Sequence, residues 1–376
     1  MKRASILAIL ALSASLLLFG CGKEKVNEDD IIEEETTIEA TQEASTEEAT
    51  EVVDDDVPPE AGMVRSKLTN EWVSADVGEL RPLAVMIPDD KSALPQYNIS
   101  NADILYECLV EGEITRLMGI FGDWTSLERV GNIRSCRDYY VYWAFEWDAI
   151  YCHAGGPFYI DEVIGRKDTN NINALTAPSG VYFRSSDRSA PQNLYLDGAD
   201  IMKEANRLGY ELTPRDNYSD EVHYQFTGKS NPNTLEVYGS DAVIASKVDL
   251  KDAYPVTQTY FEYNPDDGLY YRFQKPSNGA HMDAATDTQL AFKNLLVQFT
   301  YYETRDAKGY LAFQCNDTSR DGWYFTNGKG IHVNWKKTSD YGATKYYDDN
   351  GNEIVLNTGK TMVCIVEDGD TFTYEK

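Results

Sequence analysis

The segment His153-Ala154-Gly155-Gly156 is the part of the sequence best suited to bind or act on a ligand. It follows an apolar run at 149–152 that is typical of a buried strand, and it precedes a helix predicted from about residue 157. Open α/β sheets present ligands at such strand ends, where glycines let a ligand approach the backbone and free N–H groups attract anions. We therefore predict that His153, Gly155 and Gly156 bind a ligand, with His153 as the candidate catalytic residue. The alternative is a histidine that is hydrogen-bonded within its own turn.

Arginines in polar loops beside predicted helix starts extend this candidate site. Arg134 and Arg137 precede one helix, and Arg184 and Arg188 lie in a second polar loop. Arginine binds carboxylate or phosphate through a planar pair of N–H donors. We predict that these four side chains form the walls of an anion-accepting cleft around the histidine turn. Internal ion pairing is the alternative, and we favour it for Arg116, which lies inside an apolar strand.

Other polar patterns in the sequence are weaker. Glu107, Glu111 and Glu113 include pairs that could serve as acid and base in glycoside cleavage, but carboxylates are abundant throughout this chain. His281 and Asp283 have no visible further metal ligands, so we predict no metal and no cofactor. No P-loop, serine elbow, HExxH or dinucleotide-binding motif occurs in the sequence.

Elements that position these residues alternate between strand and helix in the first half of the chain. We expect strands at 83–87, 115–121 and 149–152, and helices from Ser100, from Asp138, at about 157–164 and at 198–208. This alternation predicts an α/β (or α+β) N-terminal domain, residues 61–224, with a helix-layered mixed sheet.

The second half of the chain reads as a β-rich C-terminal domain, residues 225–376. A hairpin is expected at 260–273, around the turn residues 264–268. We expect residues 287–297 to form one helix, or a helix that leads into a strand at 297–302. Further strands are expected at 310–314, 323–326, 330–335 and 361–366.

The extreme N-terminus predicts a lipoprotein signal peptide over residues 1–20. Lys2 and Arg3 precede an apolar run too short to span a bilayer comfortably, and Leu18-Phe19-Gly20-Cys21 has the form of a lipobox. Cys21 would carry the lipid and become the first residue of the mature protein. An uncleaved signal anchor is the alternative. We expect the protein on the extracytoplasmic face of the cell membrane.

The segment that follows is expected to be a disordered tether, residues 21–60. Between residues 22 and 60 there are sixteen acidic residues and two lysines, a net charge of −14, and no aromatic residue. Such a segment cannot bury enough apolar surface to fold. The remaining body has 46 acidic and 30 basic residues, a net charge of −16, and this argues against a nucleic-acid partner. Five cysteines follow Cys21, an odd number that predicts at least one free thiol or an intermolecular bridge.

Several motifs in both halves together resemble the YerB-like bacterial lipoproteins, a family with domain of unknown function 3048. The motifs are RPLAVMI (81–87), ADILYE (102–107), VEG (110–112), ITR (114–116), VGNIRS (130–135), HAGG (153–156), RSAP (188–191), NLY (193–195), WK (335–336), Gly351, LN (356–357) and GK (359–360). The resemblance implies an N-terminal and a C-terminal family domain outside the membrane, but no biochemical activity. Gln192 stands where the family tends to have histidine.

Two functions remain open on this basis. In the first, a membrane-anchored lipoprotein binds an anionic or cell-wall-derived ligand or a protein partner. In the second, a hydrolase or transferase acts on cell-wall material with His153 and the arginines in its cleft. We favour binding because no nucleophile and base can be recognised together.

Overall fold

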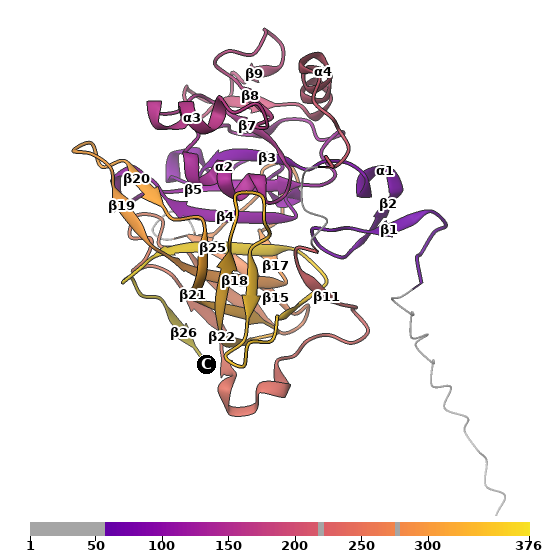
Figure 1. Cartoon of the computed structure of the whole chain (residues 1–376), viewed down its shortest axis with the longest axis vertical. Coiled ribbons are helices and arrows are strands. Elements are labelled where there is room, and N and C mark those ends of the chain that lie inside the picture. The colour runs from indigo at the N-terminus through magenta and orange to yellow at the C-terminus, as the bar shows by residue number, and fades with distance from the viewer. Residues whose placement is uncertain (1–56, 217–221, 275–278) are drawn as a thin grey trace, which may run out of the picture. The chain divides into compact units, whose positions relative to one another are not determined.

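The computed structural model describes residues 57–216, 222–274 and 279–376. The predicted signal peptide, Cys21 and most of the predicted tether lie outside these residues. A large mixed sheet organises the described part (Figure 1). Its strands lie in the spatial order β12 (Val243–Ile244), β22 (Lys329–Lys337), β21 (Asp317–Thr326), β18 (Asn294–Thr300), β25 (Thr361–Glu367), β4 (Ile104–Leu109), β5 (Thr115–Phe121), β3 (Leu83–Pro88), β7 (Ile150–His153) and β8 (Asn171–Asn173), with β23 (Lys345–Tyr347) beside β22.

This sheet runs through both halves of the chain. Strand β25, near the C-terminus, pairs in parallel with β4 on one side and with β18 on the other. In Figure 1 the violet strands β3, β4 and β5 therefore continue directly into the yellow β25. The described residues form one compact unit. The division into domains at 61–224 and 225–376 stays a prediction, and the two segments share one sheet.

Smaller sheets complete the fold. The second largest contains β16 (Gly279–Ala280), β15 (Leu269–Gln274), β14 (Tyr260–Asn264), β13 (Lys247–Asp249), β26 (Thr373–Glu375) and β17 (Ala291–Phe292). The others are β1 (Met63–Arg65) with β2 (Trp72–Ser74); β6 (Val130–Gly131), β10 (Leu194–Leu196) and β9 (Tyr182–Arg184); β11 (Gln225–Thr227) with β24 (Val355–Asn357); and β19 (Tyr302–Thr304) with β20 (Leu311–Phe313). The predicted mixed architecture with a strand-rich C-terminal region is confirmed.

Helices are few and short. They are α1 (Ala75–Gly78), α2 (Asp138–Phe145), α3 (Asp161–Ile164) and α4 (Gly198–Leu208), with 3-10 turns at Lys91–Ala93, Ile99–Asn101, Glu111–Glu113, Phe158–Ile160 and Glu236–Asp241. Helix α2 is almost wholly buried, and the hydroxyl of Tyr140 donates to the carbonyl of Arg116 in β5 at 2.6 Å. Layering of the sheet by helices beyond this contact stays a prediction. Within the described ranges, no helix combines the length and apolar character that a membrane crossing needs.

Two predicted helices are strands in the structure. The segment after Ser100 forms β4, and every residue of β4 is buried, so the run shows neither the alternation of a half-buried strand nor the period of a helix. The segment at 287–297 contains β17 and the start of β18, which is also buried. Helix α4, in contrast, has the predicted bounds: Asp197 caps its first turn and Gly209 ends it at φ +74°.

Candidate functional site

The turn after β7 lies beside the loop that leads into α2. The N–H of Ala154 donates to the carbonyl of Arg134, and the N–H of Cys136 donates to the carbonyl of Gly155, both at 2.9 Å. Gly155 has a φ of +64°, the left-handed region that favours glycine. A Cβ at Gly156 would lie 3.1 Å from the carbonyl oxygen of Cys136. The structure thus brings the loop of Arg134 and the histidine turn together. Backbone conformation explains Gly155, and close packing explains Gly156.

His153 itself is fully buried in this turn. One ring nitrogen, Nδ1, lies 2.9 Å from the carbonyl of Gly155, and Nε2 lies 3.3 Å from Oδ1 of Asn171. Burial lowers the pKa of His153. This geometry matches the alternative of a histidine bonded within its own turn. Its ring partners are a carbonyl and an amide, and neither is a nucleophile.

Two of the arginines near this turn have internal partners. Arg137 is buried and binds the carboxylate of Glu111 through two nitrogens, with 2.6 Å between Nε and Oε1. Arg116 donates to the carbonyl of Ser135 at 2.7 Å, so it is held by the backbone instead of an acid. Burial lowers the pKa of Arg116. Both side chains therefore have structural roles in this conformation.

The remaining predicted arginines differ in their contacts. Arg184 is exposed and donates to Oδ1 of Asn193 at 2.8 Å, whereas Arg188 donates to the carbonyl of Ala93 at 2.7 Å. Arg134 is partly buried, and its side chain makes no hydrogen bond or ion pair with the residues that the structure describes. Burial lowers the pKa of Arg134, partly offset by the charge of Asp90. Ligand binding by the predicted set stays a prediction, with Arg134 its most available member.

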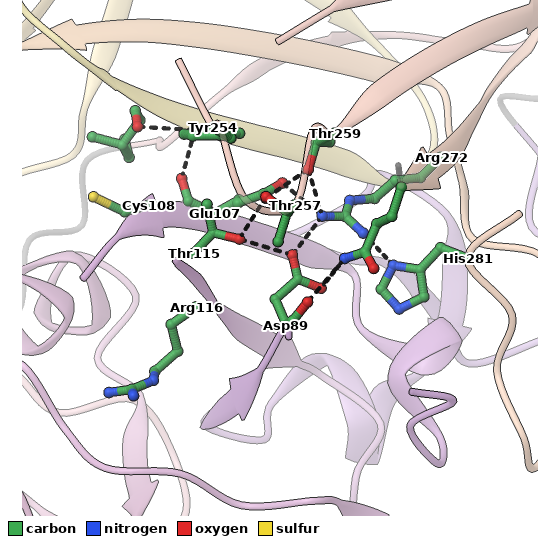
Figure 2. A network of polar contacts seen from close by, with 12 residues as sticks. Asp89, Glu107, Cys108, Thr115, Arg116, Tyr254, Thr257, Thr259, Arg272 and His281 are labelled. Carbon is green, nitrogen blue, oxygen red and sulfur yellow. Dashed lines mark hydrogen bonds and ion pairs between the residues drawn. The ribbon is translucent and has the colours of Figure 1, made fainter. Parts of the chain in front are cut away.

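A buried charge network lies at the junction of β3, β4 and β15 (Figure 2). One nitrogen of Arg272, Nη2, lies 2.7 Å from Asp89 and 2.8 Å from Glu107, and all three side chains are fully buried. One guanidinium faces two carboxylates, so one carboxyl keeps its proton. Burial and the neighbouring Glu107 raise the pKa of Asp89 to about 8.

His281 extends this network away from the carboxylates. Its Nδ1 faces the guanidinium of Arg272 (Figure 2). Its Nε2 lies 2.7 Å from Oε1 of Gln96. Because Nδ1 faces a donor, the ring is neutral with its proton on Nε2. Burial and the charge of Arg272 hold the pKa of His281 well below its usual range. The described members of this cluster are all buried, so it joins elements and does not contact solvent.

A large cavity lies elsewhere, under the β1–β2 hairpin and α1. Its volume is about 730 Å³. Apolar walls come from Leu68, Val73, Val77, Leu80, Leu127, Trp147, Tyr224 and Phe226. Five basic and five acidic residues also line the cavity, so the formal charges of its lining cancel. The basic residues are Arg65, Lys67, Arg81, Arg215 and Lys360, and the acidic residues are Asp103, Asp123, Glu146, Asp148 and Asp216.

A carboxylate–histidine pair borders the cavity. Oε2 of Glu146 lies 3.5 Å from Nε2 of His223, and the same carboxylate accepts hydrogen bonds from Tyr106 at 2.6 Å and from the Thr344 hydroxyl at 2.6 Å. The ring of His223 stacks on Trp147 with 3.6 Å between ring centres. Burial lowers the pKa of His223, whereas these partners lower the pKa of Glu146 despite its burial.

A second polar border is formed by Asp148 between two arginines. Its Oδ1 lies 3.1 Å from Arg81 and 2.6 Å from Arg215. Arg81 also donates to Oδ1 of Asn170 at 2.8 Å. These groups satisfy one another, so they stabilise the wall and offer little hydrogen-bonding capacity to a ligand.

Asp103 and Lys360 form the third polar border and are less satisfied. Oδ2 of Asp103 accepts from the N–H of Gly122 at 2.8 Å, and Nζ of Lys360 donates to the carbonyl of Ser100. Burial raises the pKa of Asp103 to about 6, although Lys360 lowers it, and burial lowers the pKa of Lys360. This border is the part of the cavity best able to recognise a ligand.

Comparison with known proteins places the chain in a family. Residues 68–211 match the N-terminal domain, and residues 248–363 the C-terminal domain, of the family described as protein of unknown function (DUF3048). The chain belongs to the DUF3048 family. It is 27% identical over 330 residues to the Bacillus subtilis (strain 168) protein named "Putative lipoprotein YerB", covering 86% of this chain and 92% of that protein. The crystal structure of YerB protein from Bacillus subtilis matches with a TM-score of 0.70 at 24% identity, over 82% of this chain and 99% of that one.

The cavity draws on both regions of the DUF3048 family match. Asp103 lies in the N-terminal region, Lys360 in the C-terminal region, and His223 in the segment between them. Sequence reasoning placed Asp103 in a helix predicted from Ser100 and did not predict the cavity. A usable signal was present, because both Asp103 and Lys360 belong to motifs that carry the family resemblance.

The cysteines of the described part have no role in this site. Cys108, Cys136, Cys152, Cys315 and Cys364 are all free and buried. Burial raises the pKa of each thiol, to about 12 for Cys136 and Cys152. Among the described residues, no group of three histidine, cysteine or acidic side chains is arranged to hold a metal ion.

Proposed function

We propose that this chain is an extracytoplasmic lipoprotein, anchored through lipid on Cys21, whose folded body binds a cell-wall-derived ligand. The lipobox and the acidic tether support the anchor. The name of the Bacillus relative agrees with it. The membrane is thus the first partner of the protein, and the wall fragment is the second.

The observation that carries the binding role is the cavity of about 730 Å³. Ligand sites in proteins commonly enclose about 300–1,000 Å³ and combine apolar walls with a few placed polar groups. This cavity has both, and its polar groups at Asp103 and Lys360 keep unused hydrogen-bonding capacity. The predicted anion site around Arg134 is a separate surface and does not contribute to this cavity.

The alternative of a wall-acting hydrolase or transferase has less support. It required His153 in a cleft beside a nucleophile, and His153 is buried with a carbonyl and an amide as ring partners. The pair of Glu146 and His223 borders the cavity, but no serine or cysteine donates to His223 in the described part. We therefore favour ligand binding.

Replacing Cys21 with alanine tests the anchor. We expect the variant to accumulate as unprocessed precursor and to lose labelling by a fatty-acid analogue, because the acylated thiol is absent. A Cys315→Ala variant is the matched control, since Cys315 is buried in the body. Equal labelling of the Cys21 variant would contradict the anchor.

Filling the cavity tests the binding role. The probe is soluble peptidoglycan fragments from a muramidase digest, and the readout is calorimetric binding to the full chain in detergent. We expect Val77→Trp, which places an indole in the cavity, to reduce affinity at least tenfold. Val237→Trp is the control because Val237 is 87% exposed and does not line the cavity. Absence of binding, or equal binding by both variants, would refute the proposed function.

A further inference from the structure

We propose that the cavity recognises a secondary amide, such as the acetamido group of an N-acetylated amino sugar, with Asp103 as hydrogen-bond acceptor and Lys360 as donor. This inference rests on the proposed function and specifies the chemistry of its ligand. It follows from where these two residues lie, which of their atoms are unused, and what surrounds them.

The two residues are neighbours across a pair of parallel strands. Thr361 in β25 lies opposite Ile104 in β4, and the N–H of Thr361 donates to the carbonyl of Asp103 at 3.1 Å. Lys360 and Asp103 immediately precede these paired residues, so they stand side by side at the amino ends of the two strands. Adjacent strands are about 4.8 Å apart. That spacing lets one small polar group contact both side chains.

Each side chain retains capacity for a ligand. Oδ1 of Asp103 accepts no hydrogen bond from any residue that the structure describes, while Oδ2 is held by the N–H of Gly122. Nζ of Lys360 has one carbonyl acceptor, Ser100, and its other N–H groups remain available. The two form no direct ion pair with each other within the described ranges. An amide supplies the missing partners, because its N–H suits the carboxylate and its carbonyl suits the ammonium.

The charge of the cavity argues against a charged ligand. Acidic and basic residues are equal in number along the lining, and the Asp148 and Glu146 carboxylates already have cationic or hydroxyl partners. A ligand with net charge would bring an uncompensated ion into a partly enclosed space. A neutral amide avoids that cost, and this distinguishes the cavity from the predicted anion site at Arg134.

An apolar contact lies beside the polar pair. A Cβ built on Gly122 would lie 3.0 Å from Oδ2 of Asp103 and 3.2 Å from Cδ1 of Leu68. The carboxylate and the leucine methyl therefore flank the same glycine. An apolar side chain thus lies close to the polar pair, as the methyl group of an acetamide requires, and enlarging Gly122 would crowd both.

The test uses calorimetry on the full chain in detergent with four defined probes. N-acetylglucosamine and N-acetyl-L-alanine methylamide carry a secondary amide, whereas glucosamine and glucose do not. We expect binding by N-acetylglucosamine and none by glucosamine or glucose. Binding by the methylamide as well would support the amide as the sole determinant, and its failure would support an N-acetylated sugar. Equal binding of glucose or glucosamine, or no binding of either amide, would overturn the inference.

Variants locate the interaction. We expect Lys360→Met to weaken N-acetylglucosamine binding about tenfold or more, since a hydrogen bond to a charged group is lost. Lys293→Met is the matched control: Lys293 is also partly buried and donates to Asn327. It lines a neighbouring cavity that Lys360 also borders, but it does not line the proposed ligand cavity. Gly122→Val is expected to weaken binding with the Asp103 carboxylate still present. Unchanged affinity in both Lys360→Met and Gly122→Val would refute the site.

The outcomes separate this inference from the proposed function. If wall fragments bind and Val77→Trp blocks them, but Lys360→Met binds normally, the cavity is a ligand site and the amide assignment is wrong. If wall fragments do not bind, or Val77→Trp does not affect them, the proposed function itself fails.

Discussion

Arg134 and Arg137 are three residues apart in one loop but have different surroundings. Arg137 is fixed by Glu111 and by the carbonyl of its neighbour Cys136, whereas the side chain of Arg134 has no described partner. Pairing makes the first a structural group. The second has the features of a side chain that remains available to an anion.

Replacing each arginine with alanine separates these roles. We expect Arg137→Ala to lower the free energy of unfolding by about 1–3 kcal/mol, because it strands the Glu111 carboxylate in a partly buried site. Arg134→Ala should cost less than about 1 kcal/mol. Urea unfolding of the two variants is the measurement. A larger loss for Arg134→Ala would mean that this residue is structural.

The pH dependence of stability reports on Asp89. Its pKa is raised to about 8 in the folded state, so its contribution to stability is full below the pKa of an unfolded aspartate and is lost as pH rises toward 8. One proton gives a limiting slope of about 1.4 kcal/mol per pH unit. We expect Asp89→Asn to flatten the plot of unfolding free energy against pH between about 4 and 8. An Asp187→Asn control, at an exposed site, should leave that slope unchanged, and the same slope in both variants would contradict the assignment.

At the scale of elements, the buried network joins β3 and β4 to the hairpin strand β15. Arg272 is the cation of this junction. Thr259, just before β14, and Gln274 in β15 contribute further hydrogen bonds. The network therefore links residues of the two predicted domains, 61–224 and 225–376.

Removing the cation should destabilise this junction strongly. We expect Arg272→Met to lower the free energy of unfolding by about 3–5 kcal/mol, since the buried carboxylate that Arg272 neutralises loses its counter-charge. Arg320→Met is a control at a more exposed ion pair with Asp317 and should cost about 1 kcal/mol or less. Denaturant unfolding compares them, and a cost for Arg272→Met as small as the control's would show that the pair contributes little.

Elements with strong local signals could be predicted from the sequence, and those defined by distant partners could not. Helix α4 has a capping aspartate and a terminal glycine, and β3 has prolines at its borders. The sequence predicts a helix where β4 lies. Strand β4 is stabilised by pairing with β25, which lies near the far end of the chain, so the local sequence does not reveal it. The same reason hid the candidate site: Asp103 and Lys360 become neighbours only through that pairing.

At the scale of the whole molecule, the acidic segment before the body is expected to contribute little to folding. Deleting residues 23–56 should change the melting temperature by less than about 2 °C, because a chain without apolar clusters adds little packing. Differential scanning calorimetry of the two proteins is the measurement. A clear fall in melting temperature would mean that the segment docks on the body, and the body start near residue 61 would be wrong.

The position of β25 also has a consequence for the secretion that we propose for this protein. A chain that crosses a membrane from its N-terminus delivers β3, β4 and β5 early, whereas β25 follows almost at the end of translocation. Until then, β4 has one open edge of unpaired backbone groups, and open edges promote aggregation. A lipid anchor attached at the front of the chain would hold this unfinished sheet at the membrane surface during that interval. If the proposed secretion is correct, extracytoplasmic chaperones are most useful to this protein before its last strand emerges.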